Sequence, residues 1–147
     1  MVKRFNLRVY AIITNSKEEI LLSKERRNGF EFTKFPGGGV EFGEGILGAL
    51  YRELKEELRA EIESASFFYV NDFFQASSFR SEDQVISFYY WVTLENLEAV
   101  CLERKTPIGC SDVEDYEQAI WVKKTAIYEL LTFPIDRIVA SKMAQGK

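Results

Sequence analysis

The sequence predicts an α/β fold in which a mixed β-sheet lies between helices. Runs rich in β-branched and aromatic residues alternate with segments of helical periodicity, and glycine or proline separates many of them. This order of elements favours a sheet with helices on both sides. The 147 residues, of which 46% are hydrophobic and 29% charged, suffice for a substantial core. No repeat or linker interrupts the chain, so we expect a single domain over residues 1–147.

The first third of the chain is expected to be mainly β. Its strands are predicted from alternating or continuous apolar runs, and its turns from Asn, Ser and Gly. The expected strands cover residues 5–14, 19–23 and 32–35, with turns at 15–18 and 28–29. Residues 24–31 are polar and are expected to lie outside the strands. Pro36 ends the third strand, and three glycines follow it.

A helix is expected over residues 45–59. Its apolar residues recur at helical spacing and form one stripe, made of Leu47, Leu50, Leu54 and Leu58. This stripe would anchor the helix to the core and leave the adjoining acidic edge free.

The second half combines strands with two C-terminal helices. Strands are expected at residues 62–74, 85–94 and 118–122, where aromatic and β-branched residues are frequent. A helix through Leu131 is expected to start with Thr125 as its N-cap, and another helix is expected over residues 135–145.

Three glutamates on the predicted helix indicate a metal site. Glu53, Glu56 and Glu57 fall at i, i+3 and i+4, so their carboxylates share one surface and repel one another. Divalent cations such as magnesium favour carboxylate oxygens of this kind. The alternative is a solvated acidic face, since glutamate is also a good helix former. Local basic partners for that alternative are Arg52, Lys55 and Arg59.

The spacing around these glutamates resembles the signature of the Nudix hydrolases. Five residues separate Gly38 from Glu44, and seven more separate Glu44 from Arg52. Residues 35–41, FPGGGVE, are similar to the usual lead-in of that family. The positions that agree with the signature are Gly38, Glu44, Arg52, Glu53, Leu54, Glu56 and Glu57.

Two positions depart from the signature at the expected end of the helix. Arg59 stands where the family has glycine, and Ala60 stands at the last aliphatic position. Glycine there would supply a left-handed cap. We therefore expect either a left-handed Arg59, at a modest conformational cost, or a helix that continues toward Ile62. No carboxylate is lost in either case.

The resemblance implies an α/β/α sandwich with a central mixed sheet and a loop–helix–loop catalytic motif. It also implies magnesium-dependent cleavage of the pyrophosphate linkage in a nucleoside diphosphate derivative, such as a nucleotide sugar or ADP-ribose; manganese is an expected substitute. One alternative is a nucleoside triphosphate pyrophosphohydrolase that clears damaged nucleotides. A third alternative is a nucleotide-binding regulatory domain with weak catalysis.

The expected site follows from the matched positions. The metal ligands would be Gly38, through its carbonyl, with Glu53, Glu56 and Glu57. Catalytic roles are expected for Glu57, Arg52, Glu53 and Glu44, with Arg52 orienting a carboxylate and Glu44 favouring the helix start. The general base stays open among Glu57, Glu98, Glu114, Asp115 and Glu117. Each of the last four has a solvated-loop alternative.

Composition narrows the remaining chemistry and the partners. The chain has no histidine, which excludes imidazole ligands and Ser-His or Cys-His pairs. Cys101 and Cys110 form no CxxC motif.

A net charge of −4 argues against broad nucleic-acid binding, so a small-molecule nucleotide is the expected partner. Candidate phosphate-binding residues are Lys24, Arg26 and Arg27. Without a secretory or transmembrane pattern the expected location is the cytoplasm, and a homodimer is left open.

Overall fold

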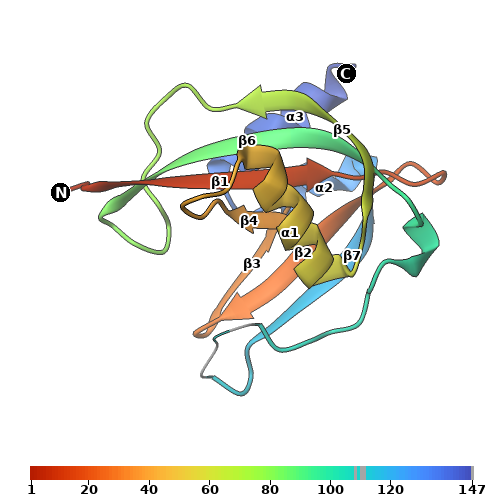
Figure 1. Cartoon of the computed structure of the whole chain (residues 1–147), viewed down its shortest axis with the longest axis horizontal. Coiled ribbons are helices and arrows are strands. Elements are labelled where there is room, and N and C mark those ends of the chain that lie inside the picture. Colours follow the sequence, from red (N-terminus) through yellow and green to blue (C-terminus); the bar gives the residue numbers. More distant parts are fainter. Residues whose placement is uncertain (108, 110–111, 147) are drawn as a thin grey trace.

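The strands form two sheets with helices packed against them (Figure 1). The computed structural model describes residues 1–107, 109 and 112–146; Cys110 lies outside the described residues. The four-stranded mixed sheet has the order β4-β1-β6-β5. Its strands are β1 (Arg4–Ile12), β4 (Gly37–Gly39), β5 (Ile62–Val70) and β6 (Asp83–Leu94). The three-stranded sheet has the order β3-β2-β7 and consists of β2 (Glu19–Arg27), β3 (Phe30–Lys34) and β7 (Tyr116–Lys123).

The parallel pairing of β1 with β6 forms the centre of the mixed sheet. Its register runs from Arg4 opposite Asp83 to Ile12 opposite Trp91. The other pairings in both sheets are antiparallel. A parallel pair requires a long crossover connection, and here that connection contains the other two strands of its sheet and helix α1 (Ile46–Leu58).

Alternating side chains of β1 supply two cores, one on each face of the mixed sheet. Val9 and Ala11 face the core that contains the buried residues of α1. Tyr10 and Ile12 face the core that contains buried residues of helix α3 (Pro134–Ala144). Helices therefore cover both faces, which confirms the predicted α/β/α arrangement.

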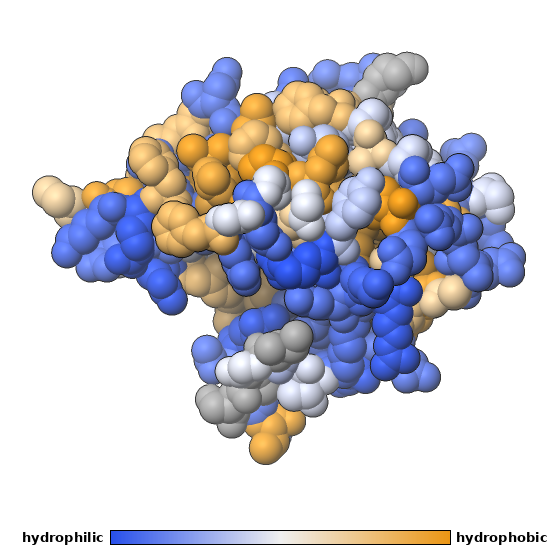
Figure 2. Space-filling view, in the orientation of Figure 1, coloured by the Kyte–Doolittle hydropathy of each residue, from blue (hydrophilic) through white to orange (hydrophobic). Residues whose placement is uncertain are grey.

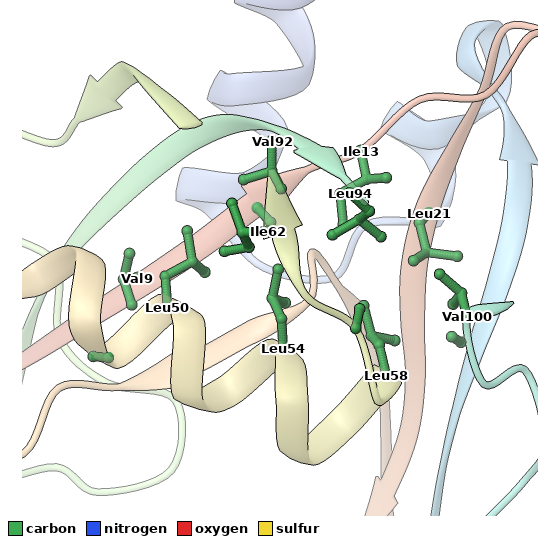
Figure 3. Packing of buried hydrophobic residues seen from close by; sticks show 14 residues of the cluster. Val9, Ile13, Leu21, Leu50, Leu54, Leu58, Ile62, Val92, Leu94 and Val100 are labelled. Atoms are coloured by element: carbon green, nitrogen blue, oxygen red, sulfur yellow. The ribbon is translucent and has the colours of Figure 1, made fainter. Parts of the chain in front are cut away.

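Helix α1 carries most of the predicted apolar stripe. Leu50, Leu54 and Leu58 are buried, and Figure 3 shows them pointing from the helix toward the sheet. Leu47 lies in the first turn and is 39% exposed, so the stripe begins one turn later than predicted. The helix ends at Leu58 because Arg59 adopts the left-handed conformation (φ 55°, ψ 38°); its N–H donates to the Lys55 carbonyl, and the Ala60 N–H donates to the Leu54 carbonyl. The expected left-handed Arg59 is confirmed, and the continued helix is not seen.

Two predicted strand ends are wrong. Strand β2 continues to Arg27 through the polar segment, because both of its edges are paired, with β3 and β7. Strand β5 stops at Val70, four residues earlier than predicted. The Asn71 side chain then donates to the Phe73 and Val85 carbonyls and accepts the Ser87 N–H, so side-chain bonds replace the ladder there.

The predicted N-cap at Thr125 is also wrong. This residue lies inside a 3-10 turn, η2 (Lys124–Ala126), and the helix α2 (Ile127–Leu130) follows without a side-chain cap. A further 3-10 turn, η1 (Leu97–Ala99), follows β6. Pro134 occupies the first turn of α3, where its missing N–H needs no partner. No helix among the described residues is long and apolar enough to cross a membrane.

Candidate active site

The glycine turn, which consists of Pro36 and the three glycines of β4, allows helix α1 to approach the backbone of the mixed sheet closely. Gly37 has φ +142°, and a Cβ there would collide with the Val9 carbonyl oxygen. A Cβ at Gly38 would lie 2.5 Å from the carboxylate carbon of Glu53. Gly37 therefore lets β4 lie close to β1, and Gly38 lets a helix carboxylate rest against β4.

Arg52 is the centre of the first charged cluster, which we call the arginine hub. Its Nε donates to Glu44 Oε2 at 2.6 Å and its Nη2 donates to Glu44 Oε1 at 2.9 Å. Nη2 also donates to the Gly39 carbonyl at 3.0 Å, and Nη1 donates to Glu53 at 3.1 Å and Glu56 at 3.4 Å. The guanidinium thus ties the loop before α1 to the helix and the glycine turn.

The hub stabilises the charged forms of Glu44 and Arg52. The hydrogen bonds from Arg52 and from the Glu41 backbone N–H lower the pKa of Glu44 to about 2. The hydrogen bond to Glu44 correspondingly raises the pKa of Arg52. The same guanidinium also donates to Glu53 and Glu56, so one positive charge is shared among three carboxylates.

A second cluster, the acidic group, consists of Glu25, Glu57 and Glu117. One carboxylate oxygen from each lies within 4.8 Å of the others. Glu25 and Glu117 are directly opposite in the antiparallel pair of β2 and β7, where like charges are destabilising. Glu57 reaches them from the last turn of α1, and its Oε1 accepts the Gly37 N–H at 3.2 Å.

The acidic group carries more negative charge than its surroundings balance. Burial raises the pKa of Glu57 to about 8; attraction to Lys34 opposes this, while the charges of Glu25, Glu53 and Glu117 add to it. Burial and Glu25 also raise the pKa of Glu117. Raised carboxylate pKa values are expected where a positive charge is missing. The acidic group therefore fits a divalent cation by both its oxygen ligands and its unbalanced charge.

Among the described residues two cations form ion pairs with the acidic group, and a third, Lys105, opposes the rise in the pKa of Glu117 and donates to the Glu57 carbonyl. Arg27 Nη2 lies 3.6 Å from Glu25 and 3.7 Å from Glu117. Lys34 Nζ lies 3.4 Å from Glu25 Oε2. Burial raises the pKa of Glu25, but Lys34 and the hydroxyl donor Ser23 outweigh it, so the pKa of Glu25 is lowered. Only part of the cluster is therefore neutralised.

A cleft of about 810 Å³ opens beside these residues. Glu25, Glu53 and Glu57 line it together with the glycine turn. Its far wall is aromatic: the centroids of Phe32, Phe79 and Phe133 lie between 5.2 and 5.7 Å from one another. Hydrophilic side chains gather on the lower half of the face seen in Figure 2, and apolar ones gather over β5 and β6 above.

The floor of the cleft contains a buried acid. Asp136, on α3, accepts a hydrogen bond from the Tyr89 hydroxyl, and both residues line the cleft. Burial raises the pKa of Asp136 to about 6, against the opposing effect of the Tyr89 donor.

The structure brings only some of the predicted site residues together. Glu57 joins the acidic group, and Glu53 lies against Gly38 at the cleft edge. Glu56 is exposed and is not one of the three; its carboxylate is 3.4 Å from Arg52. Gly38 lines the cleft between the two clusters.

The alternative general bases lie in different surroundings. Of these, Glu117 is part of the acidic group. Asp115 accepts the Asn28 N–H at 2.8 Å and supports the turn between β2 and β3. Glu98 is exposed, and Glu114 is 77% exposed beside Arg26.

Sequence reasoning missed Glu25, Lys34 and the aromatic residues Phe79 and Phe133. A signal for Glu25 was available, because Ser23, Glu25 and Arg27 alternate on one face of the strand. Among the predicted phosphate-binding residues, Arg27 lines the cleft. Arg26 instead forms ion pairs with Asp112, Glu114 and Asp115, and Lys24 is exposed.

The fold is a mixed sheet between helices, and carboxylates gather at the glycine turn beside a cleft. These features together define the class of an α/β phosphohydrolase. The chain belongs to the NUDIX domain family, whose sequence model matches residues 4–140. Membership of this family places it among the hydrolases that act on pyrophosphate bonds. Members of the family generally use divalent metals, and the acidic group has the ligands to hold one.

Similar proteins support this assignment. A MutT structure, from work on Aliivibrio salmonicida and Vibrio cholerae, is 28% identical with a TM-score of 0.65, and the match covers 97% of this chain and 99% of that one. The E. coli ORF135 protein is 21% identical with a TM-score of 0.67, covers 96% and 90%, and so shows the fold alone. The RNA pyrophosphohydrolase of Ruthia magnifica subsp. Calyptogena magnifica is 39% identical over 62 residues, which are 42% of this chain and 34% of that protein.

Proposed function

We propose that this protein is a magnesium-dependent pyrophosphohydrolase that acts on a nucleoside diphosphate derivative, such as a nucleotide sugar or ADP-ribose. The single observation that carries this proposal is that Glu25 and Glu57 of the acidic group line the same cleft as the aromatic wall. A diphosphate needs its charge neutralised, and a nucleobase needs an apolar surface on which to stack. The described cleft offers both.

The acidic group would hold the cation. We assign Glu57 with Glu25 and Glu117 as its carboxylates, with Glu53, Glu56 and the Gly38 carbonyl as further ligands. When bound, a divalent cation neutralises phosphate oxygens and acidifies a coordinated water. Magnesium is the preferred ion because it combines carboxylates with substrate phosphates, and manganese is the expected substitute.

The remaining residues bind, orient and accept a proton. Glu57 and Glu117 are the candidate general bases, because burial raises the pKa of each carboxylate and so makes its ionised form a stronger proton acceptor. Arg52 holds Glu53 at the cleft edge, with Glu44 fixing the guanidinium on its other side. Arg27 would receive a phosphate: its Nε is a buried nitrogen without a hydrogen-bond partner within residues 1–107, 109 and 112–146.

A nucleoside triphosphate is the second candidate substrate. The relative from Ruthia magnifica is named an RNA pyrophosphohydrolase. That name refers to a pyrophosphate group on a nucleic acid and not to a nucleotide sugar. A nucleotide-binding regulatory domain with weak catalysis is the third alternative. The signature carboxylates Glu53, Glu56 and Glu57 are all present, which supports an enzyme over that reading. The proposal includes one domain over residues 1–147, a cytoplasmic location and either a monomer or a homodimer.

A product-release assay tests the function. The purified protein is incubated with nucleoside triphosphates, ADP-ribose, nucleotide sugars, dinucleoside polyphosphates and NADH, with and without magnesium. We expect magnesium-dependent release of a nucleoside monophosphate from a diphosphate derivative. Inorganic pyrophosphate from a triphosphate would instead establish the second candidate. Absence of turnover on every compound, with nucleotide binding retained, would establish the regulatory reading.

A further inference from the structure

Lys34, the last residue of β3, places an enclosed positive charge beside the acidic group. Its side chain is only 7% exposed. Nζ donates to the Gly37 carbonyl at 3.0 Å and to the Phe35 carbonyl at 3.2 Å, and it lies 3.4 Å from Glu25 Oε2. The ring centroid of Tyr10 is 5.4 Å away. Burying a lysine is unfavourable unless its charge is paired, so this arrangement depends on Glu25 and the two carbonyls.

The ammonium connects three elements that meet at the site. It reaches from β3 to Glu25 on β2 and to Gly37 in the glycine turn. Gly37 in turn donates its N–H to Glu57 on α1. Lys34 and Glu57 therefore hold the same glycine from opposite sides, and Lys34 fixes the geometry of a turn that it does not belong to.

Lys34 also differs from Arg27, which forms ion pairs with the same acidic group. The Arg27 side chain is 39% exposed and lies 3.6 Å from Glu25 and 3.7 Å from Glu117. Water screens that charge, whereas it has little access to Lys34. The enclosed charge partly balances the acidic group without an ion, and it repels any dication that binds there.

We propose that Lys34 is the resident counter-cation of the acidic group. It positions Glu25 and Gly37 while no ion is bound, and it limits the affinity of the group for a divalent cation. The inference rests on the proposed function for the identity of the ligand, and its stability arm can be measured on the ion-free protein. A unit charge about 4 Å from a divalent ion changes its affinity by at least about tenfold even at the dielectric constant of bulk water.

The test compares Lys34→Met with Lys24→Met, which removes an exposed lysine of β2 that does not line the cleft. For Lys34→Met we expect a lower melting temperature without ions and manganese binding about tenfold tighter by calorimetry. For Lys24→Met we expect both values to stay at wild type. Unchanged or weaker manganese binding by Lys34→Met would overturn the inference.

Two further variants keep the result decisive. Lys34→Arg retains the charge and should bind manganese within about twofold of wild type; a tenfold change in its affinity contradicts the inference. In the ion-free protein, Glu25→Gln added to Lys34→Met should recover part of the lost melting temperature, because it removes the carboxylate left unpaired. No recovery contradicts the counter-cation role. If the wild-type protein binds manganese but hydrolyses none of the compounds, the proposed function is wrong, and the inference about Lys34 can still be tested.

Discussion

The arginine hub and the acidic group both contact the glycine turn and differ in how their carboxylates are paired. In the hub, one guanidinium binds Glu44, Glu53 and Glu56, and the pKa of Glu44 falls to about 2. In the acidic group, burial dominates and the pKa of Glu57 rises to about 8. Each hub carboxylate accepts a hydrogen bond from Arg52, whereas Glu25 and Glu117 face each other as like charges across two strands. The surroundings of the carboxylates, rather than their number, mark the acidic group as the candidate binding site.

The largest expected effect comes from Glu57→Gln in the acidic group. Loss of this ligand and candidate base should lower kcat by about a hundredfold or more. Melting of the ion-free protein at pH 7 should stay at or above the wild-type temperature, because the raised pKa keeps Glu57 protonated there. Glu61→Gln, which removes an exposed partner of Lys55, is the control. Full activity of Glu57→Gln would disprove the assignment.

Arg52→Gln tests the other side of the comparison. It leaves Glu44 and Glu53 without their donor, so activity should fall by about ten- to a hundredfold and the melting temperature should fall as well. Lys55→Gln, on the same helix, should change neither value strongly, because its ion pair with Glu61 is exposed. If Arg52→Gln lost activity but not stability, Arg52 would belong with the chemistry rather than with the scaffold.

The two clusters should respond to pH in opposite directions. The raised pKa of Glu57 means that the folded protein holds a proton that the unfolded chain releases near pH 4.5, so the ion-free melting temperature should fall between about pH 5 and 8. A difference of one in pKa between the folded and unfolded states corresponds to about 1.4 kcal/mol of stability. The lowered pKa of Glu44 gives stability that is present above pH 4.5 and lost as the pH falls toward 2.

Magnesium and a variant separate these contributions. Saturating magnesium should remove the decline between about pH 5 and 8, because the ion binds the deprotonated group. Glu57→Gln should remove it without any ion. A decline that persists in Glu57→Gln would place its origin outside the acidic group; thermal melts across the pH range make the comparison.

The smallest expected effect belongs to the end of helix α1. Arg59→Gly relieves the left-handed conformation of a residue with a side chain and should raise stability by about 0.5–1 kcal/mol. Activity should not change, because Arg59 lies outside both clusters. A chemical denaturation curve measures the gain, and Arg59→Ala is the control that should show none. Lower stability of Arg59→Gly would mean that the arginine side chain contributes to the cap.

The sequence was most informative where local periodicity determines the structure. The spacing of Leu50, Leu54 and Leu58 predicted helix α1, and the helix positions predicted that Arg52 orients a carboxylate, whereas its pairing with Glu44 was not predicted. Both depend on residues of one helix and the loop before it. Strand ends were less predictable, since the ends of β2 and β5 depend on partners and on the Asn71 side chain.

The acidic group could not be predicted from the sequence of helix α1 alone. Glu25 and Glu117 meet because β2 and β7 pair in one particular register, and a register one residue away would turn these side chains to the other face. Lys34 was missed for the same reason, since its partner Glu25 lies on the neighbouring strand. Long-range strand pairing, which has no local sequence signal, brings Glu25, Glu117 and Lys34 into the candidate site.

The parallel pairing of β1 and β6 sets the order in which the protein can be completed during synthesis. Arg4 meets Asp83, a residue 79 positions later, and until then β1 has only the three-residue β4 beside it. Strand β1 therefore leaves the ribosome well before β6 and has an open edge until β6 is made. Contacts so distant in sequence form slowly, so a chain arrested before β6 should expose that edge to other nascent chains.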